Sequence, residues 1–314
     1  MEFLINIFKN RFGHFRGGWR ILFYFALFIL LSELIISLCD SYLQIKGDDL
    51  HDYDLLINRF ISKSLRLLTV LLPAIFLLKW IDKRPIGLLG ISLYKGTIKE
   101  LCTGMVIGLL LGIVGISMTQ LLGLGSLTLN PIDLNLIFYL AAVLAILIIS
   151  AVYEEILFRG YIFQSSIEGT NIIITLVLVS SLFGAAHLDN EDVTVFYILF
   201  TICAGIFLGV MYYRTRALWM CIGTHFIWNW TIGPIFGMGI EENPFLRRSL
   251  FNYQSIEGNV NSGINGLEDL VQAIIFIILT IVLWKSNWFK PAEYNSKLWV
   301  QYPLKYGAVP DNQR

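Results

Sequence analysis

The strongest constraint on this chain is a series of eight apolar segments. A helix of about 20 mostly apolar residues spans the hydrocarbon core of a bilayer. We therefore predict an all-α fold, a polytopic transmembrane bundle of about eight helices. The segments lie at roughly residues 19–39, 60–80, 100–122, 134–163, 171–187, 193–212, 217–236 and 267–284.

The composition supports the same interpretation. Of the 314 residues, 56% are hydrophobic and 15% are charged, whereas a soluble domain carries about 25% charged residues. Basic and acidic residues balance at 23 each, so the chain lacks the basic excess of a nucleic-acid-binding protein. We expect the lipid bilayer as a partner, and no nucleic acid.

The cysteines do not indicate a disulfide framework or a thiolate zinc site, because they lie far apart in apolar stretches and form no C-x-x-C pair. They are Cys39, Cys102, Cys203 and Cys221. We interpret them as small buried hydrophobic residues.

Basic residues predict the orientation, since they concentrate on the cytoplasmic side. With the N-terminus inside, 17 of the 23 basic residues fall on the cytoplasmic side. Of the six outside, Arg59, Lys63 and Arg66 lie at the start of the second segment. We predict that both termini are cytoplasmic and that the first segment is an uncleaved anchor, because it is too long for a signal peptide.

The fourth segment contains Glu154, Glu155 and Arg159 after a strongly apolar run. Neighbouring residues on a helix point about 100° apart, so the two carboxylates cannot do the same work. Glu155 and Arg159 are four apart and can pair, which leaves Glu154 without a local partner. Alternatively, the helix ends near residue 152 and the three charges lie in the headgroup layer.

Three further polar residues stand in the later segments. His187 ends the fifth segment, and His225 and Asn229 lie one turn apart in the seventh. Their alternative roles are structural: an interfacial histidine, and hydrogen bonds between helices. Counted along the helices, Glu154, His187 and His225 lie roughly 13–24 Å inside the membrane.

These groups could meet in one place. Glutamate with histidine can activate water, and histidine with asparagine can stabilise an oxyanion. Two histidines with a glutamate also form a zinc ligand set. The reaction class that uses such groups is amide hydrolysis.

Taken together, the motifs E-E-x-x-x-R, F-x-x-x-H and H-x-x-x-N resemble the CAAX-processing and bacteriocin-processing intramembrane proteases, the CPBP or Abi family. The resemblance covers about residues 140–235. Gly205, Gly209 and the stretch Arg214-Thr215-x-x-Leu218-Trp219 support it.

The resemblance implies a role for each motif residue. Glu154 would be the base that activates water, and Arg159 would brace the Glu154–Glu155 pair. His187 would share that water or bind a metal. His225 and Asn229 would hold the oxyanion or bind zinc. A zinc site at His187, His225 and Glu154 and a metal-free glutamate mechanism both stay open.

It also implies a substrate: the C-terminus of a lipidated protein, or a small peptide such as a bacteriocin. We divide the chain into N-terminal helices (1–133), a catalytic core (134–236), and a final part with an external loop, the eighth helix and a cytoplasmic tail (237–314). Short loops and the lack of an organelle signal favour a bacterial plasma membrane.

Two other functions remain to be weighed. In a proton-coupled transporter, Glu154, Glu155 and His187 would relay protons, but the inverted repeats common in transporters are not visible. An immunity or scaffold protein could retain the protease fold.

Overall fold

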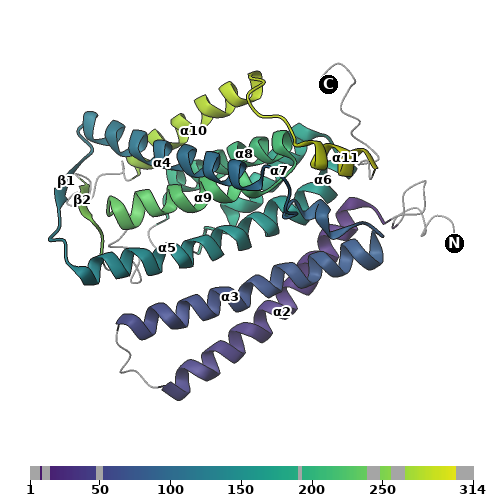
Figure 1. The fold of residues 1–314 in the computed structure, drawn as a ribbon, viewed down its shortest axis with the longest axis horizontal. Helices are drawn as coiled ribbons and strands as arrows, with labels where there is room; N and C mark the ends of the chain where they lie inside the picture. The colour runs from purple at the N-terminus through teal and green to yellow at the C-terminus, as the bar shows by residue number, and fades with distance from the viewer. Residues whose placement is uncertain are drawn as a thin grey trace.

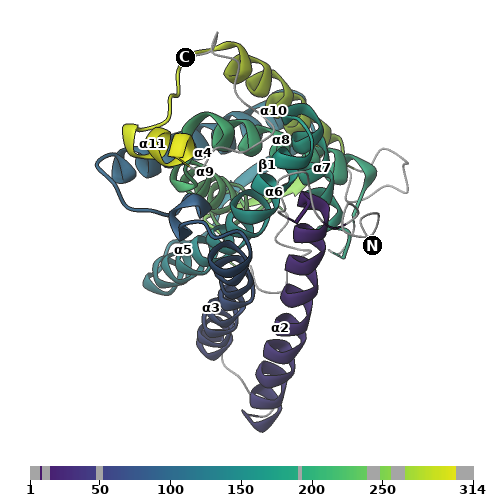
Figure 2. The same cartoon turned by 90° about the vertical axis from the view of Figure 1, so that its right-hand side faces the viewer.

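The computed structural model shows a bundle of helices with one small β-ribbon at one end (Figures 1 and 2). It describes residue 8 and the ranges 15–46, 52–189, 193–238, 248–255 and 266–301. The α-helices are α2 (Gly17–Lys46), α3 (Asp52–Phe76), α4 (Thr97–Leu121), α5 (Leu134–Glu155), α6 (Phe163–Gly169), α7 (Ile172–Ala185), α8 (Val195–Thr215), α9 (Trp219–Trp230), α10 (Leu267–Lys285) and α11 (Glu293–Gln301). Shorter turns are the π-helices η1 (Leu77–Ile81), η3 (Ile156–Ile162) and η4 (Thr231–Ile235), and the 3₁₀-helix η2 (Ile86–Leu89).

All eight predicted segments are helical, which confirms the all-α polytopic fold. Six helices of the described chain are long and apolar enough to cross a membrane. The other two segments form the 14-residue α7 and the 12-residue α9, which continues into η4. The count of eight crossings therefore stays a prediction.

The helix that carries the two glutamates does not end near residue 152. It begins after Asp133, whose carboxylate accepts a hydrogen bond from the Leu136 backbone N–H at 2.6 Å. It then runs through α5, η3 and α6 as one apolar span of 36 residues, Leu134–Gly169. Such a helix is about 54 Å long, whereas the hydrocarbon core is about 30 Å thick. Glu154 and Glu155 thus lie near its middle, where a headgroup position is excluded.

Helix α4 packs on α9 so closely that their backbones touch. A Cβ atom on Gly104 would collide with the Met220 carbonyl oxygen, and one on Gly108 with that of Thr224. The Thr224 hydroxyl also donates to the Gly104 carbonyl at 3.1 Å. Small residues four apart let membrane helices approach in this way. This contact holds α9, and with it His225, against the first part of the chain.

An ion cluster joins α2 to the bundle at the other side. The Arg20 guanidinium pairs with Asp82 at 2.6 Å and also contacts Glu168. Arg84 binds the second oxygen of Glu168, and the Tyr161 hydroxyl donates to Asp82 at 3.1 Å. Since these residues come from α2, the segment after η1, η3 and α6, the cluster ties four parts of the chain together.

A two-stranded antiparallel ribbon was not predicted from the sequence. Strand β1 (Gly125–Leu129) pairs with β2 (Phe251–Ser255), with Gly125 opposite Ser255. The segment 237–266, interpreted from its composition as a loop, therefore contains a strand. Its residues Phe245 and Leu246 lie outside the described residues. The ribbon lies at the end of the bundle opposite α11 (Figure 1).

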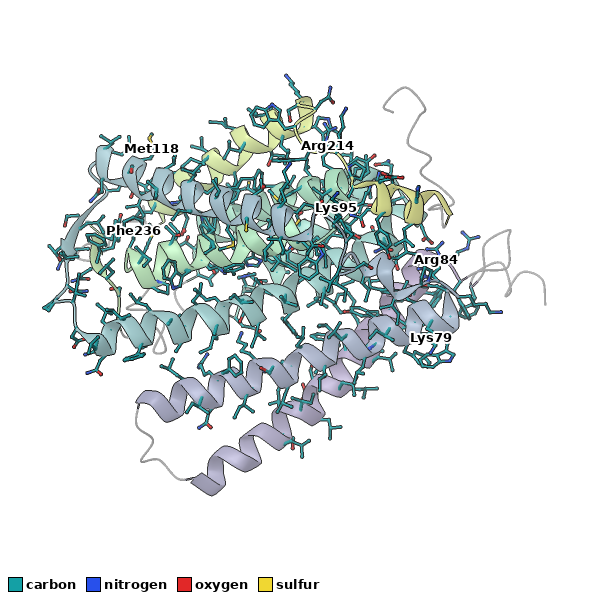
Figure 3. The ribbon with its side chains drawn as sticks, viewed as in Figure 1. Lys79, Arg84, Lys95, Met118, Arg214 and Phe236 are labelled. Atoms are coloured by element: carbon teal, nitrogen blue, oxygen red, sulfur yellow. The ribbon has the colours of Figure 1, made fainter. Side chains whose placement is uncertain are left out.

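The beginning of α2 and helix α11 lie at the same end of the bundle (Figure 1). Basic side chains gather there: Lys79, Arg84, Lys95 and Arg214 are drawn toward this end in Figure 3, and Met118 and Phe236 toward the other. The described part of the tail packs on the bundle through a stacked pair, Tyr94 and Tyr294, with ring centroids 6.0 Å apart. This arrangement fits the predicted orientation, in which this end is cytoplasmic.

The orientation can be tested with cysteine labelling in intact cells. Ser126→Cys in β1 should react with a membrane-impermeant maleimide, because the ribbon end faces outward. Lys95→Cys should react only after the cells are opened, and the unsubstituted protein gives the background from native cysteines. Labelling of position 95 in intact cells would show that the orientation is reversed.

The α4–α9 contact predicts a specific sensitivity to one methyl group. Gly108→Ala should lower stability by about 1–3 kcal/mol or prevent accumulation, because the new Cβ meets backbone atoms that cannot turn aside. Gly169→Ala is the matched control, since nothing lies within 4 Å of its added Cβ. Thermal unfolding in detergent measures both. Equal stability of the two variants would contradict the close backbone contact.

Candidate active site

A buried ion pair forms the base of the site. The Arg159 Nη1 donates to Glu155 Oε1 at 3.0 Å, and the side chains are 1% and 0% exposed. This confirms the pairing predicted from their spacing. Arg159 Nη2 also donates to the Gly205 carbonyl of α8 at 3.1 Å, and its guanidinium lies 4.6 Å from the centre of the Phe183 ring. The pair is thus enclosed by α7 and α8.

His225 of α9 completes this arrangement. Its Nδ1 lies 2.8 Å from Glu155 Oε1, the same oxygen that accepts from Arg159. An ionised Glu155 can only accept, so the proton of a neutral His225 belongs on Nδ1. The Nε2 atom is then left with a free lone pair, and a carboxylate behind a histidine fixes its orientation and raises its basicity.

Glu154 lies on the other side of His225. Its Oε2 is 3.6 Å from His225 Nε2, too far for a hydrogen bond, and has no hydrogen-bond partner in the described part of the chain. Its side chain is 23% exposed, whereas that of Glu155 is 0% exposed. The two neighbouring carboxylates therefore occupy different environments. One is enclosed with Arg159 and His225, and the other is accessible beside the free nitrogen of His225.

His187 stays apart from this group. Its Nδ1 lies 2.8 Å from the Phe183 carbonyl oxygen of its own helix end. The Phe183 ring separates the two imidazoles, with its centroid 4.8 Å from that of His187 and 6.1 Å from that of His225. The two histidines are thus second neighbours through Phe183.

The described side chains do not form a metal centre. No three His, Cys, Asp or Glu side chains among them are placed to hold a metal ion. In this geometry His187 is engaged with Phe183, and His225 with Glu155. The zinc site at His187, His225 and Glu154 does not fit these positions, so we derive no chemical step through a metal. The metal dependence itself stays an open prediction.

Asn229 follows His225 by one turn of α9 and is half-buried. It makes no hydrogen bond to another described residue. Its amide is therefore available to a ligand, as the sequence motif predicts, but its role remains a prediction.

The turn between α8 and α9 holds α9 in place. Leu218 donates its backbone N–H to the Gly90 carbonyl at 2.9 Å, and Trp219 Nε1 donates to the Ser92 carbonyl at 2.9 Å. Arg214 donates to the Trp284 and Ser286 carbonyls at the end of α10, at 2.6 and 2.8 Å. The supporting stretch of the sequence motif thus positions the helix that carries His225.

One set of charged residues near the site was placed differently by the sequence. Arg59, Lys63 and Arg66 were expected at the start of a helix, but α3 begins at Asp52, so they lie within it. The Lys63 ammonium interacts electrostatically with the Glu154 carboxylate. The spacing of 59, 63 and 66, which places them on one face of a helix, is the signal that could have predicted this.

Comparison with known proteins agrees with the motifs. Residues 136–231 match the family model described as type II CAAX prenyl endopeptidase Rce1-like. The chain carries a CAAX protease domain. The match includes every residue of the site, from Glu154 to Asn229. No curated protein and no solved structure matches the chain.

The fold and this match together define the protein at a coarse level. It is a multi-pass membrane protein whose protease-family domain lies within the predicted core at 134–236. The surrounding helices belong to the same bundle, since α4 of the first part packs on α9 and α10 of the last part on α8. The division at residues 133 and 236 remains a prediction.

The buried ion pair predicts a large stability effect. Glu155→Gln leaves Arg159 without its counter-charge and should destabilise the protein by about 3–5 kcal/mol. Glu293→Gln is the matched control, because Glu293 pairs with Lys297 four residues on but both side chains are exposed. The control should unfold at the wild-type temperature. Thermal unfolding in detergent that gives equal midpoints for both variants would show that Glu155 has no structural role.

Proposed function

We propose that the protein is an intramembrane endopeptidase in which Glu154 activates water for attack on a peptide carbonyl. One observation carries this proposal: an accessible carboxylate 3.6 Å from a His225 nitrogen whose orientation Glu155 and Arg159 fix. A water or carbonyl oxygen placed against both groups would touch a base and a histidine at once. The family match of the same residues supports it.

The proposed reaction is hydrolysis without a covalent intermediate. Glu154 takes a proton from water as the water oxygen attacks the carbonyl carbon, and the carbonyl electron pair moves to the oxygen. The tetrahedral intermediate then collapses with cleavage of the C–N bond. The protonated Glu154 donates its proton to the leaving amine, which restores the carboxylate for the next turnover.

The other residues of the site have supporting roles in this proposal. His225, and the Asn229 amide one turn on, stabilise the negative charge on the carbonyl oxygen. Arg159 keeps Glu155 ionised, so that Glu155 can orient His225. His187 is placed to meet the substrate on the far side of Phe183. We favour the metal-free glutamate mechanism over zinc, because Glu154 and His225 lie together without His187.

The substrate class follows from the membrane location of the site. We propose a lipidated protein C-terminus or a small peptide, because a substrate must reach a carboxylate near the middle of a membrane-spanning helix. The predicted orientation and the short loops favour a bacterial plasma membrane. A proton-coupled transporter or an immunity protein has no comparable supporting observation.

The test is cleavage of a quenched fluorescent prenylated peptide by the purified protein in detergent. Glu154→Gln keeps the shape of the side chain but removes the base, so cleavage should fall to background while yield and thermal midpoint stay unchanged. Glu155→Gln should lower the midpoint as well, which separates the two carboxylates. Full activity of Glu154→Gln would exclude Glu154 as the base and overturn the mechanism.

A further inference from the structure

The face of α3 that packs on the bundle changes character partway along the helix. Leu56 and Val70 lie on this face and are buried, at 8% and 0% exposure. Between them, the residues at spacings of three and four are Arg59, Lys63 and Arg66. Residues at such spacings share one side of a helix. Three consecutive positions of an otherwise apolar packing face are thus cationic, and we call them the α3 cation row.

The row lies beside the active site. Leu56 packs with Tyr139 and Val143 of α5, and α3 and α5 run side by side in the same direction (Figure 1). Seven to ten residues further along α3 are Lys63 and Arg66, and eleven further along α5 from Val143 is Glu154. The row therefore reaches the level of Glu154, in agreement with the electrostatic interactions of Lys63 with Glu154 and of Arg66 with Tyr153.

The charge of the row is not balanced by a contact within the protein. Neither Lys63 nor Arg66 forms an ion pair within 4.0 Å among the described residues. Glu33 of α2, an acidic residue on the neighbouring helix, is exposed and pairs with neither of them in that part of the chain. Cations at membrane depth are costly, and where they occur they face protein, water or a ligand and mark a functional path. The row is therefore suited to receive an anion.

The position of the row restricts which part of a substrate can meet it. It extends from the level of Glu154 toward the end of the bundle where α3 begins, over about 10 Å from residue 66 to residue 59. An extended peptide advances about 3.3–3.6 Å per residue. A group on the row is thus within about three residues of a peptide bond held at Glu154. The negative group that every unmodified peptide carries at such a distance from a terminal cut is its C-terminal carboxylate.

We infer that Lys63 and Arg66, with Arg59 one turn further out, form a subsite for the C-terminal carboxylate of the peptide substrate. This inference rests on the proposed endopeptidase function and deepens it. The subsite would restrict the enzyme to bonds a few residues from a free C-terminus. Lys63 and Arg66 are then specificity-determining residues, since they contact the substrate away from the reacting atoms.

The experiment compares two quenched prenylated peptides that differ only at the C-terminus, one a carboxylate and the other a carboxamide. The wild-type protein should cleave the carboxylate peptide with a kcat/KM about 10- to 100-fold higher, the range for a hydrogen bond to a charged group. The double variant Lys63→Met/Arg66→Met should lose this preference through a higher KM for the carboxylate peptide. Its KM for the carboxamide should not change.

Lys79→Met is the matched control. Lys79 lies in η1, which continues α3, and its exposed side chain covers Trp80 with the ammonium 5.0 Å from the ring centroid. This variant removes one cation from the same helical run and should keep the full preference. If the methionine double variant does not fold, as judged by thermal unfolding, Lys63→Gln/Arg66→Gln replaces it.

The outcomes separate the inference from the proposed function. Cleavage of both peptides at equal rates by the wild-type protein, or a preference that survives in the double variant, overturns the subsite and leaves the endopeptidase intact. Failure to cleave either peptide counts against the endopeptidase. In that case, fluorescence anisotropy of the same peptides bound to wild-type and double-variant protein still tests the subsite, and equal binding of carboxylate and carboxamide overturns it.

An acidic lipid headgroup is the other source of an anion in a membrane. The cleavage assay is therefore repeated in vesicles of phosphatidylcholine with and without phosphatidylglycerol. The preference for the carboxylate should persist in both. If phosphatidylglycerol abolishes the preference in the wild-type protein, the row binds lipid headgroups and the assignment to the substrate is wrong.

Discussion

The fold depends on the need to enclose the Glu155–Arg159 ion pair away from water. Removing two charges from water costs several kcal/mol per ion, and only their mutual attraction and further hydrogen bonds offset that cost. The hydrogen bonds come from the Gly205 carbonyl of α8 and from His225 of α9, and the Phe183 ring of α7 covers the guanidinium. Helices α5, α7, α8 and α9 must therefore meet at this point. Because Glu155 is fully engaged there, the neighbouring Glu154 remains accessible.

The sequence predicts the helices well, because a membrane-spanning helix depends on its own composition. It places all eight segments, but it ends the fourth at residue 163 rather than Gly169, since the polar residues of α6 break the apolar run. It misses β1 and β2 because each is five residues long and is stabilised by a partner more than a hundred residues away. Such pairing leaves no local pattern.

The same difference between local and distant contacts divides the site predictions. The Glu155–Arg159 pair follows from a spacing of four within one helix, and the structure contains it. The bond from Glu155 to His225 joins residues 70 apart, and no periodicity indicates it. The position of Lys63 beside Glu154 was missed for a third reason. The expected start of its helix at residue 60 excluded the polar first turns of α3, which begins at Asp52.

The contact between α4 and α9 also has a consequence for synthesis. Gly108 and Thr224 touch through their backbones, yet they are separated by roughly 120 residues of chain. At about 5–20 residues per second, a ribosome adds that length in roughly 6–24 s. During this interval the glycine face of α4 has no partner and its backbone groups are covered only by lipid or by the insertion machinery. The order of membrane insertion thus leaves the closest helix contact of the bundle to be made late, after the glutamates of α5 have already entered the bilayer.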